Sequence, residues 1–490
     1  MARPNVLVIM SDQFRWDCLG VAGNPDVRTP TLDRLARDGV WFPTTFCPLP
    51  VCTPARYSLL SGLYVHQHGG WTNHCTLAPE LDTFPRAMRR AGYATRGIGK
   101  MHFTPTYLDV GFDALELAEQ NGPGRYDDDY HRELMAAGLV PSTDLYDQER
   151  EWRGGAPASY WETFGAERSN LPEEWHSTTW IGDRTVRAIE RWEEAPERPQ
   201  LLMASFVKPH HPFDPPSPWD ELYDPSGLTI LPGWTDAPPA HDAAYGAGYF
   251  PHEKLTGAAL RRVMAYYYAT ITQIDHHVGR MIAALERQGL YEQTTIVFTA
   301  DHGEYLGFHH LLLKGRPMYE PLSRVPLIIK LPRGGRAGEA SETLASTVDV
   351  APTILRACGL EPGGDMVGLD LTDPAAQRDC AFAEIRRGAA YMARTRTHKL
   401  LLGRNEAQTQ LLDLEGDPYE LRNVKDEQPE VRAELEGRLG RWLLFESPTP
   451  VRLDEGAPQI AGENVPPGRE HREALREFFQ REMARVGGGA

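Results

Sequence analysis

The chain has 490 residues, and 51 Lys and Arg against 68 Asp and Glu give it a formal net charge of −17. Its 41% hydrophobic and 24% charged residues are typical of a folded globular protein and exclude a largely disordered chain. The acidic balance argues against general nucleic-acid binding, because a phosphate backbone is attracted by a positive field. The length alone is compatible with about three domains.

The cysteines and the apolar segments indicate the compartment. The six cysteines form no C-x-x-C pair and are too sparse for a disulfide framework, so we expect reduced, buried thiols at every position except Cys52. The apolar run at 6–10 is too short for a signal peptide, and no stretch approaches the roughly 20 apolar residues of a membrane span. We therefore expect a cytoplasmic protein without a membrane partner.

Apolar runs alternate with helical patterns through the first three quarters of the chain. The longest helical pattern, from Leu260 to Leu285, repeats apolar residues at steps of three and four, and Gly289 is its expected stop. Such alternation predicts a mostly parallel sheet between helices. Strands are expected at 5–10, 94–97, 201–207, 294–299 and 326–329, and helices at 31–38, 53–61 and 260–285.

Changes in pattern divide the chain into parts. We expect an α/β catalytic domain over 1–375, with long insertions at about 121–180 and 209–250 that decorate the site at the carboxyl ends of the strands. Shorter strands at 390–395 and 399–402, and a helix at 429–443, predict a small α+β subdomain over 376–447. Residues 448–490 form a Pro-rich tail that ends in a charged helix at about 470–484.

The sharpest motif is C-T-P-A-R at 52–56, followed by Ser61 and Gly62. It resembles the signature of the sulfatases, formylglycine-dependent members of the alkaline-phosphatase-like superfamily. The resemblance implies that a maturation enzyme oxidises Cys52 to formylglycine, whose hydrate is the nucleophile, in the general manner of covalent catalysis. A tyrosine-phosphatase loop is a poor alternative, because the spacing between Cys52 and Arg56 is too short for it.

Two further segments match the family's metal-ligand pairs. They are S-D-Q at 11–13, which closes the first strand, and D-H-G-E at 301–304, which follows the strand at 294–299. The resemblance implies one divalent ion held by Asp12, Gln13, Asp301 and His302, together with the converted Cys52. Many sulfatases have Asp-Asp and Asp-Asn at these pairs, commonly with calcium. The amide and the imidazole of this chain shift the expectation toward manganese, zinc or magnesium, and the identity stays open.

Three more segments match family motifs whose residues bind the anionic group of the substrate. They are G-K-M-H at 99–102, P-H-H-P at 209–212, and L-G-F-H at 306–309 with a lysine five residues later. The family resemblance implies that Lys100 and Lys314 bind the sulfate oxygens, that His102 is the base, and that His210, with Lys314, protonates the departing oxygen. It also implies that Arg56 steadies the formylglycine hydroxyl and that Asn73 contacts the substrate. For His211 and His309 we expect exposed or structural roles.

The resemblance spans roughly residues 4–445 and implies an alkaline-phosphatase-like α/β fold, with a mostly parallel sheet between helices and a smaller C-terminal α+β subdomain. The expected activity is hydrolysis of small sulfate monoesters. Choline sulfatases and phosphonate monoester hydrolases share the Asp-Gln and Asp-His pattern, so a phosphonate monoester or phosphodiester hydrolase is the alternative. A silent anion-binding relative with an unconverted Cys52 is a third possibility. The net charge of −17 disfavours long polyanionic substrates, and the tail helix is a candidate homo-oligomer contact.

Overall fold

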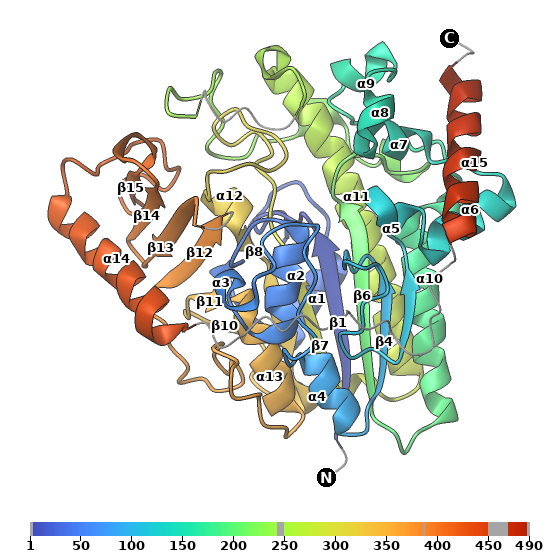
Figure 1. Cartoon of the computed structure of the whole chain (residues 1–490), viewed down its shortest axis with the longest axis horizontal. Helices are drawn as coiled ribbons and strands as arrows, with labels where there is room; N and C mark the ends of the chain where they lie inside the picture. Colours follow the sequence, from blue (N-terminus) through green and yellow to red (C-terminus); the bar gives the residue numbers. More distant parts are fainter. Residues whose placement is uncertain (1–2, 243–248, 386–387, 449–468, 488–490) are drawn as a thin grey trace.

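The computed structural model describes residues 3–242, 249–385, 388–448 and 469–487. A large central sheet is flanked by helices, and a smaller sheet lies to one side of it (Figure 1). The expected α/β class, with a mostly parallel sheet and a separate C-terminal subdomain, is confirmed. Among the described residues, no helix combines the length and apolar character that crossing a bilayer requires.

The central sheet has the strand order β10-β2-β9-β7-β1-β6-β4-β5. Its core is parallel: β1 pairs with β6 and β7, and β4 pairs with β5 and β6. The short β9 runs antiparallel to both β7 and β2. The strands are β1 (Asn5–Asp12), β2 (Val40–Trp41), β4 (Ala94–Gly99), β5 (Ala114–Leu117), β6 (Gln200–Pro209), β7 (Thr294–Ala300), β9 (Leu327–Lys330) and β10 (Glu339–Ala340).

Alternate residues of β1 serve two separate cores, as the two-residue period of a strand requires. Leu7 and Ile9 pack against one set of helices, whereas Val6, Val8 and Met10 pack against another. The first face is covered by α1 (Pro30–Asp38), α10 (Ser177–Glu190) and α11 (Gly257–Arg287). The second is covered by α2 (Cys52–Ser61), α4 (Phe84–Arg90) and α13 (Val350–Ala357).

The first insertion is largely helical, and its last helix, α10, belongs to the main fold. Five short helices precede α10: α5 (Gly122–Arg125), α6 (Asp129–Ala137), α7 (Ser142–Gln148), α8 (Arg150–Arg153) and α9 (Ala158–Glu162). The tail helix α15 (Arg469–Gly487) lies against α6 (Figure 1). Its buried Leu475, Phe479 and Met483 pack on Tyr126 and Leu145 of the insertion. Residues 243–248 of the second insertion, and 449–468 and 488–490 of the expected tail, lie outside the described residues.

The C-terminal part contains an antiparallel sheet with the order β12-β13-β14-β15, and α14 (Pro429–Arg441) packs on β13 and β14. Its strands are β12 (Ala381–Ile385), β13 (Ala390–Arg394), β14 (His398–Gly403) and β15 (Gln410–Asp413). A third, three-stranded sheet joins β3 (Thr45–Phe46), β8 (Arg324–Val325) and β11 (Ala345–Ser346).

Buried ion pairs fasten the C-terminal subdomain to the catalytic domain. Glu320, in the short helix α12 (Glu320–Ser323), lies 2.8 Å from the Lys399 Nζ of β14 and 3.3 Å from the Arg394 Nε. Lys399 also pairs with Glu420 at 2.6 Å. Removing one member of such a network would leave an uncompensated buried charge and would be strongly destabilising.

Candidate active site

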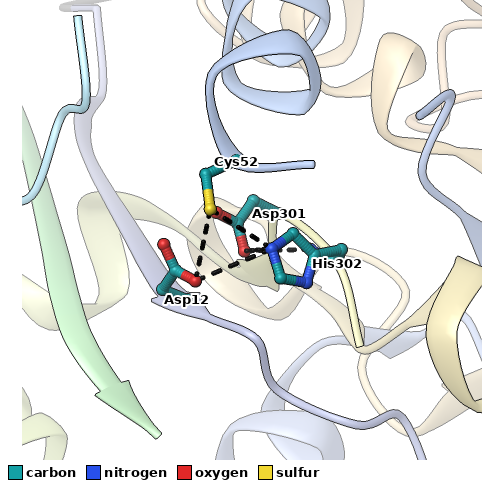
Figure 2. Close-up of side chains that lie close together, drawn as sticks. All are labelled: Asp12, Cys52, Asp301 and His302. Atoms are coloured by element: carbon teal, nitrogen blue, oxygen red, sulfur yellow. Dashed lines mark hydrogen bonds and ion pairs between the residues drawn. The ribbon is translucent and has the colours of Figure 1, made fainter. Parts of the chain in front are cut away.

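Four side chains with metal-binding atoms meet at the carboxyl end of the central strands. Asp12 ends β1, and Asp301 and His302 directly follow β7, the parallel neighbour of β1. Cys52 is the first residue of α2. One ligand atom from each lies within 4.8 Å of the others, with the Cys52 Sγ 3.4 Å from the His302 Nε2 and 3.8 Å from the Asp12 Oδ1 (Figure 2). All four are buried, so segments far apart in sequence build one pocket for a cation.

Gln13 completes the ligand set predicted from the sequence. Its Nε2 donates to the buried Glu304 carboxylate, and its backbone N–H donates to the Asp301 Oδ1 at 3.1 Å. Its side-chain Oε1 is buried and accepts no hydrogen bond from the described residues. A buried oxygen without a partner is costly, so it is a natural ligand atom for a cation. Two carboxylates, an amide oxygen and an imidazole fit a divalent metal ion.

Two buried cations hold the ligand carboxylates in place. Arg56 donates from Nη2 to the Asp12 Oδ2 at 3.0 Å and from Nε to the Asp301 Oδ2 at 2.9 Å, and the Lys100 Nζ lies 2.7 Å from the Asp12 Oδ2. Burial and the Cys52 sulfur raise the pKa of Asp12. The positive charges of Lys100 and Arg56 outweigh them and hold the pKa well below its usual range. Asp12 is therefore an anion that can bind a cation. Arg56 donates its hydrogen bonds to the carboxylates of the two expected metal ligands, Asp12 and Asp301.

Lys314 and His210 lie beside Cys52, and the Lys314 Nζ is also 3.3 Å from the His302 Nε2. The Lys314 Nζ is 3.3 Å from the Cys52 Sγ and 3.0 Å from the His210 Nε2, while the His210 Nδ1 lies 2.6 Å from the backbone carbonyl oxygen of His211. Although burial raises the pKa of the Cys52 thiol, Lys314, Lys100 and His302 together lower it well below its usual range. A sulfur in this position behaves as an anion, and an anionic group of a ligand would meet the same cations.

Burial, and then the charge of Lys314, lower the pKa of His210 well below its usual value, so the imidazole is neutral. Lys314 is affected in the opposite sense: burial lowers its pKa, but Cys52 and the two carboxylates raise it above its usual value. Lys314 consequently keeps its proton and donates to the His210 Nε2. The pair forms a proton-bearing unit 3.3 Å from the Cys52 sulfur, measured from the Lys314 Nζ.

The remaining predicted residues surround the N-terminus of α2. The Asn73 Oδ1 accepts from the Thr53 N–H at 3.1 Å, and the Thr53 hydroxyl donates to the His102 carbonyl at 2.7 Å. His102 has a φ of 55°, and its Nδ1 is buried without a partner among the described residues. An unpaired buried nitrogen beside the nucleophile position is available for a substrate or for a proton. All eleven predicted site residues therefore lie in or next to one cluster of side chains around Cys52.

Three supporting residues were not predicted as part of the site. Glu304 orients Gln13, Glu119 accepts from the backbone N–H of His102 at 2.8 Å, and the Gln120 Oε1 accepts from the Lys100 Nζ at 2.9 Å. Glu304 stands in the D-H-G-E motif at 301–304, so its place two residues after His302 was a usable signal. Glu119 and Gln120 follow β5 in a segment without a motif, and only the pairing of β4 with β5 brings them here.

His309 is structural, as expected. It belongs to a second group of potential ligands with His241 and Asp242. However, its Nδ1 is 2.7 Å from the Asp242 Oδ2 and its Nε2 is 2.8 Å from the Tyr419 carbonyl. With both ring nitrogens occupied, His309 links the second insertion to the C-terminal subdomain and has no nitrogen free for a metal ion.

Comparisons with known proteins show the family of this chain. Residues 4–360 match the family model described as Sulfatase, and residues 307–443 match the model described as N-sulphoglucosamine sulphohydrolase, C-terminal. An arylsulfatase of Clostridium perfringens is 30% identical over 453 residues, covering 86% of this chain and 90% of that protein. An N-acetylglucosamine-6-O-sulfatase of Bacteroides thetaiotaomicron is 26% identical over 480 residues, covering 86% and 82%.

Among solved structures, a phosphonate monoester hydrolase of Agrobacterium radiobacter superposes with a TM-score of 0.72 at 26% identity, covering 89% of this chain and 95% of that one. The same scaffold therefore serves sulfur and phosphorus esters. The family model spans most of the catalytic domain, including every residue of the metal-ligand group and the pair of His210 and Lys314. The chain belongs to the sulfatase family and is a sulfuric ester hydrolase.

Proposed function

We propose that this chain hydrolyses small sulfate monoesters with Cys52 matured to formylglycine and one divalent ion bound by Asp12, Gln13, Asp301 and His302. The observation that carries the proposal is the position of Cys52. Its sulfur lies against both the group of metal ligands and the Lys314–His210 pair: it is 3.4 Å from the His302 Nε2 and 3.3 Å from the Lys314 Nζ, and these two nitrogens are themselves 3.3 Å apart. A nucleophile placed there is next to both the cation and the source of a proton.

The bound ion and the formylglycine would together supply a hydroxyl nucleophile at residue 52 and positive charge next to it. The chain's own residues bind and orient the ester. Lys100 and Lys314 attract the sulfate oxygens, and the preorganised charges favour the transition state, where negative charge moves toward the leaving oxygen. Arg56 keeps Asp12 and Asp301 in position, and so acts on the ligands of the ion.

We assign the proton transfers to two histidines, His210 and His102. Lys314 donates to the His210 Nε2, so this pair is placed to deliver a proton to the departing alkoxide. His102, whose Nδ1 has no partner among the described residues, is the base we assign to the step that regenerates the nucleophile. The Asn73 Oδ1 accepts a hydrogen bond from the Thr53 N–H and so positions the first turn of α2. We also expect Asn73 to contact the substrate.

The donor set favours manganese, zinc or magnesium over calcium. Only two of its members are carboxylates, and the His302 nitrogen is a softer ligand than the oxygens that calcium prefers. A metal-resolved activity screen, in which chelated protein is reconstituted with each ion, tests this preference. Highest activity with calcium would contradict it.

The central test compares an aryl sulfate, a sugar sulfate, choline sulfate, a phosphonate monoester and a phosphodiester. We expect sulfate esters to be preferred and Cys52→Ala to abolish turnover, whereas Cys75→Ala, at a half-buried cysteine outside the site, should match the unmodified chain. Preference for the phosphorus esters would favour the alternative hydrolase, which the similarity to a phosphonate monoester hydrolase supports. Full activity of Cys52→Ala would refute both.

Peptide mass spectrometry separates an active sulfatase from a silent anion-binding relative. Conversion of the thiol to the aldehyde lowers the mass of the peptide by about 18 Da, a covalent change that needs a maturation enzyme as partner. We expect this loss on the peptide that contains Cys52 and no change on the peptide that contains Cys75. An unconverted Cys52 in protein co-expressed with such an enzyme would support the silent relative. We also propose that the chain forms a homo-oligomer, which native mass spectrometry tests.

A further inference from the structure

A second imidazole lies beside the proposed proton donor. The rings of His210 and His211 have their centroids 4.1 Å apart with an interplanar angle of 31°. His211 stands within the P-H-H-P segment at 209–212. It keeps 7% exposure, whereas its partner Asp147 is fully buried. His211 is therefore a largely buried side chain next to the proposed proton donor, not an exposed surface histidine.

Both insertions contribute to this environment. Asp147 comes from α7, Tyr160 from α9 and Tyr249 from the second insertion. The two phenol hydroxyls donate to the Asp147 Oδ1 at 2.5 Å each, and the His211 Nδ1 pairs closely with the Asp147 Oδ2. Burial raises the pKa of Asp147, but His211 and the two tyrosines lower it below its usual value, so the carboxylate is ionised.

This arrangement determines what each nitrogen of His211 can do. Because the carboxylate accepts, Nδ1 carries a hydrogen, and the ring orientation is set by that bond. The Nε2 makes no hydrogen bond to any described residue. In the neutral ring Nε2 is an acceptor, and in the protonated ring it is a donor. A hydroxyl group can donate or accept, so it is the ligand that suits both states.

The position of the His211 ring beside His210 indicates where in the substrate a hydroxyl bound by the His211 Nε2 would lie. His210 and Lys314 are placed at the leaving oxygen of the ester, and the ring of His211 lies one ring spacing away. Two oxygens on neighbouring carbon atoms lie closer together than this, and hydrogen bonds that diverge from them can lead to two adjacent rings. A leaving group with a hydroxyl next to its ester carbon can therefore reach both rings at once.

We propose that His211, positioned by Asp147, is a specificity residue that hydrogen-bonds to a hydroxyl on the carbon next to the ester carbon of the leaving group. The inference rests on the proposed sulfatase reaction. Its expected substrates are sulfate monoesters of vicinal diols, such as sugar sulfates and catechol sulfates. The backbone carbonyl of His211, which accepts from His210, is present in every variant at this position. A change of the His211 side chain therefore leaves that support of the proton donor in place.

The test uses two aryl sulfates that differ only in one neighbouring hydroxyl: 4-nitrophenyl sulfate and the 4-nitrocatechol sulfate isomer whose nitro group is para to the sulfate, 2-hydroxy-4-nitrophenyl sulfate. We expect His211→Phe, which keeps a ring in the stack, to raise KM for 4-nitrocatechol sulfate about tenfold or more, the effect of losing one hydrogen bond to a polar site. The kcat on this ester, and both constants for 4-nitrophenyl sulfate, should stay within about threefold, because the lost contact is uniform binding. Taking the variant-to-wild-type ratio for each ester cancels their different intrinsic reactivity.

Asp147→Asn provides a second variant that keeps the packing and removes the charge that orients the ring. Asp147→Asn should also raise the KM for 4-nitrocatechol sulfate. The matched control is His276→Phe, at an exposed histidine of α11, and it should leave this KM unchanged. If the variants lose activity equally on both esters, the proposal is overturned and His211 is a structural residue. Unchanged kcat and KM on both esters would also overturn the proposal. If His211→Phe fails to fold, Asp147→Asn decides by the same criterion.

The two proposals fail in different ways. If the unmodified chain cleaves neither sulfate ester, the sulfatase reaction and the role of His211 fall together. If it cleaves both and the variants leave their KM ratio unchanged, only the role of His211 falls.

Discussion

The orientation of the Gln13 amide can be tested through Glu304, which the metal ion would not touch. The two oxygens of this buried carboxylate accept from different donors: Oε1 from the Leu306 N–H at 3.1 Å and Oε2 from the Gln13 Nε2. Glu304→Gln keeps the size of the side chain but leaves a single acceptor oxygen. Its new amide group must then face another donor, or Gln13 must turn over and direct its Oε1 at residue 304. In the second case the metal site loses an oxygen ligand.

Loss of a group that orients a metal ligand typically weakens metal binding by about 10- to 100-fold, which is about 1.4 to 2.7 kcal/mol. We expect this loss for Mn²⁺ binding to chelated, reconstituted protein, measured by isothermal titration calorimetry. An unpaired buried donor also costs about 1 to 3 kcal/mol of stability, so the thermal midpoint of the metal-free protein should be compared in parallel. The matched control is Glu342→Gln, at a side chain that is 85% exposed.

A folded Glu304→Gln protein that binds Mn²⁺ within threefold of the unmodified chain would refute this reasoning. It would show that the buried Oε1 of Gln13 is not a ligand, or that Glu304 does not orient it. An equal loss in Glu342→Gln would show that the effect has no connection with the position of the residue.

Three further predictions follow from the same geometry. Lys314→Met should lower kcat/KM for a sulfate ester about 10²- to 10³-fold, as expected for one lost charge-stabilising donor, with unchanged far-UV circular dichroism. Burial lowers the pKa of His66, but the Glu384 carboxylate at 2.9 Å raises it above its usual value. Its stabilisation is then complete below the unfolded pKa and is lost as the pH rises through the folded pKa, so urea unfolding should show a decrease in stability with rising pH that His66→Asn diminishes. Phe479→Asp places a charge in the buried contact between α15 and α6, and we expect limited proteolysis to release the tail faster than in the control Phe445→Asp, at a side chain that is 71% exposed.

Local pattern was sufficient for the elements that the site uses. The apolar run that begins at Asn5, the strand expected at 294–299 and the periodic helix from Leu260 to Leu285 coincide with β1, β7 and α11 within a few residues. These segments are buried and strongly periodic, and such patterns are the most reliable ones in a sequence. The helix 177–190 was not anticipated, because its apolar positions lie among the aromatic residues of an insertion.

The residues of the metal group were also predictable, since each stands in a short motif directly after a strand or at the start of a helix. Their neighbours were not. Glu119 and Gln120 reach Lys100 and His102 only because β5 pairs with β4, and Asp147 meets His211 only because the two insertions fold against each other. No local signal records such contacts, because they depend on which strands pair and on how distant segments pack. The motif residues follow from local sequence, whereas the hydrogen-bond partners that orient them, and with them the specificity that we propose, follow from the tertiary fold.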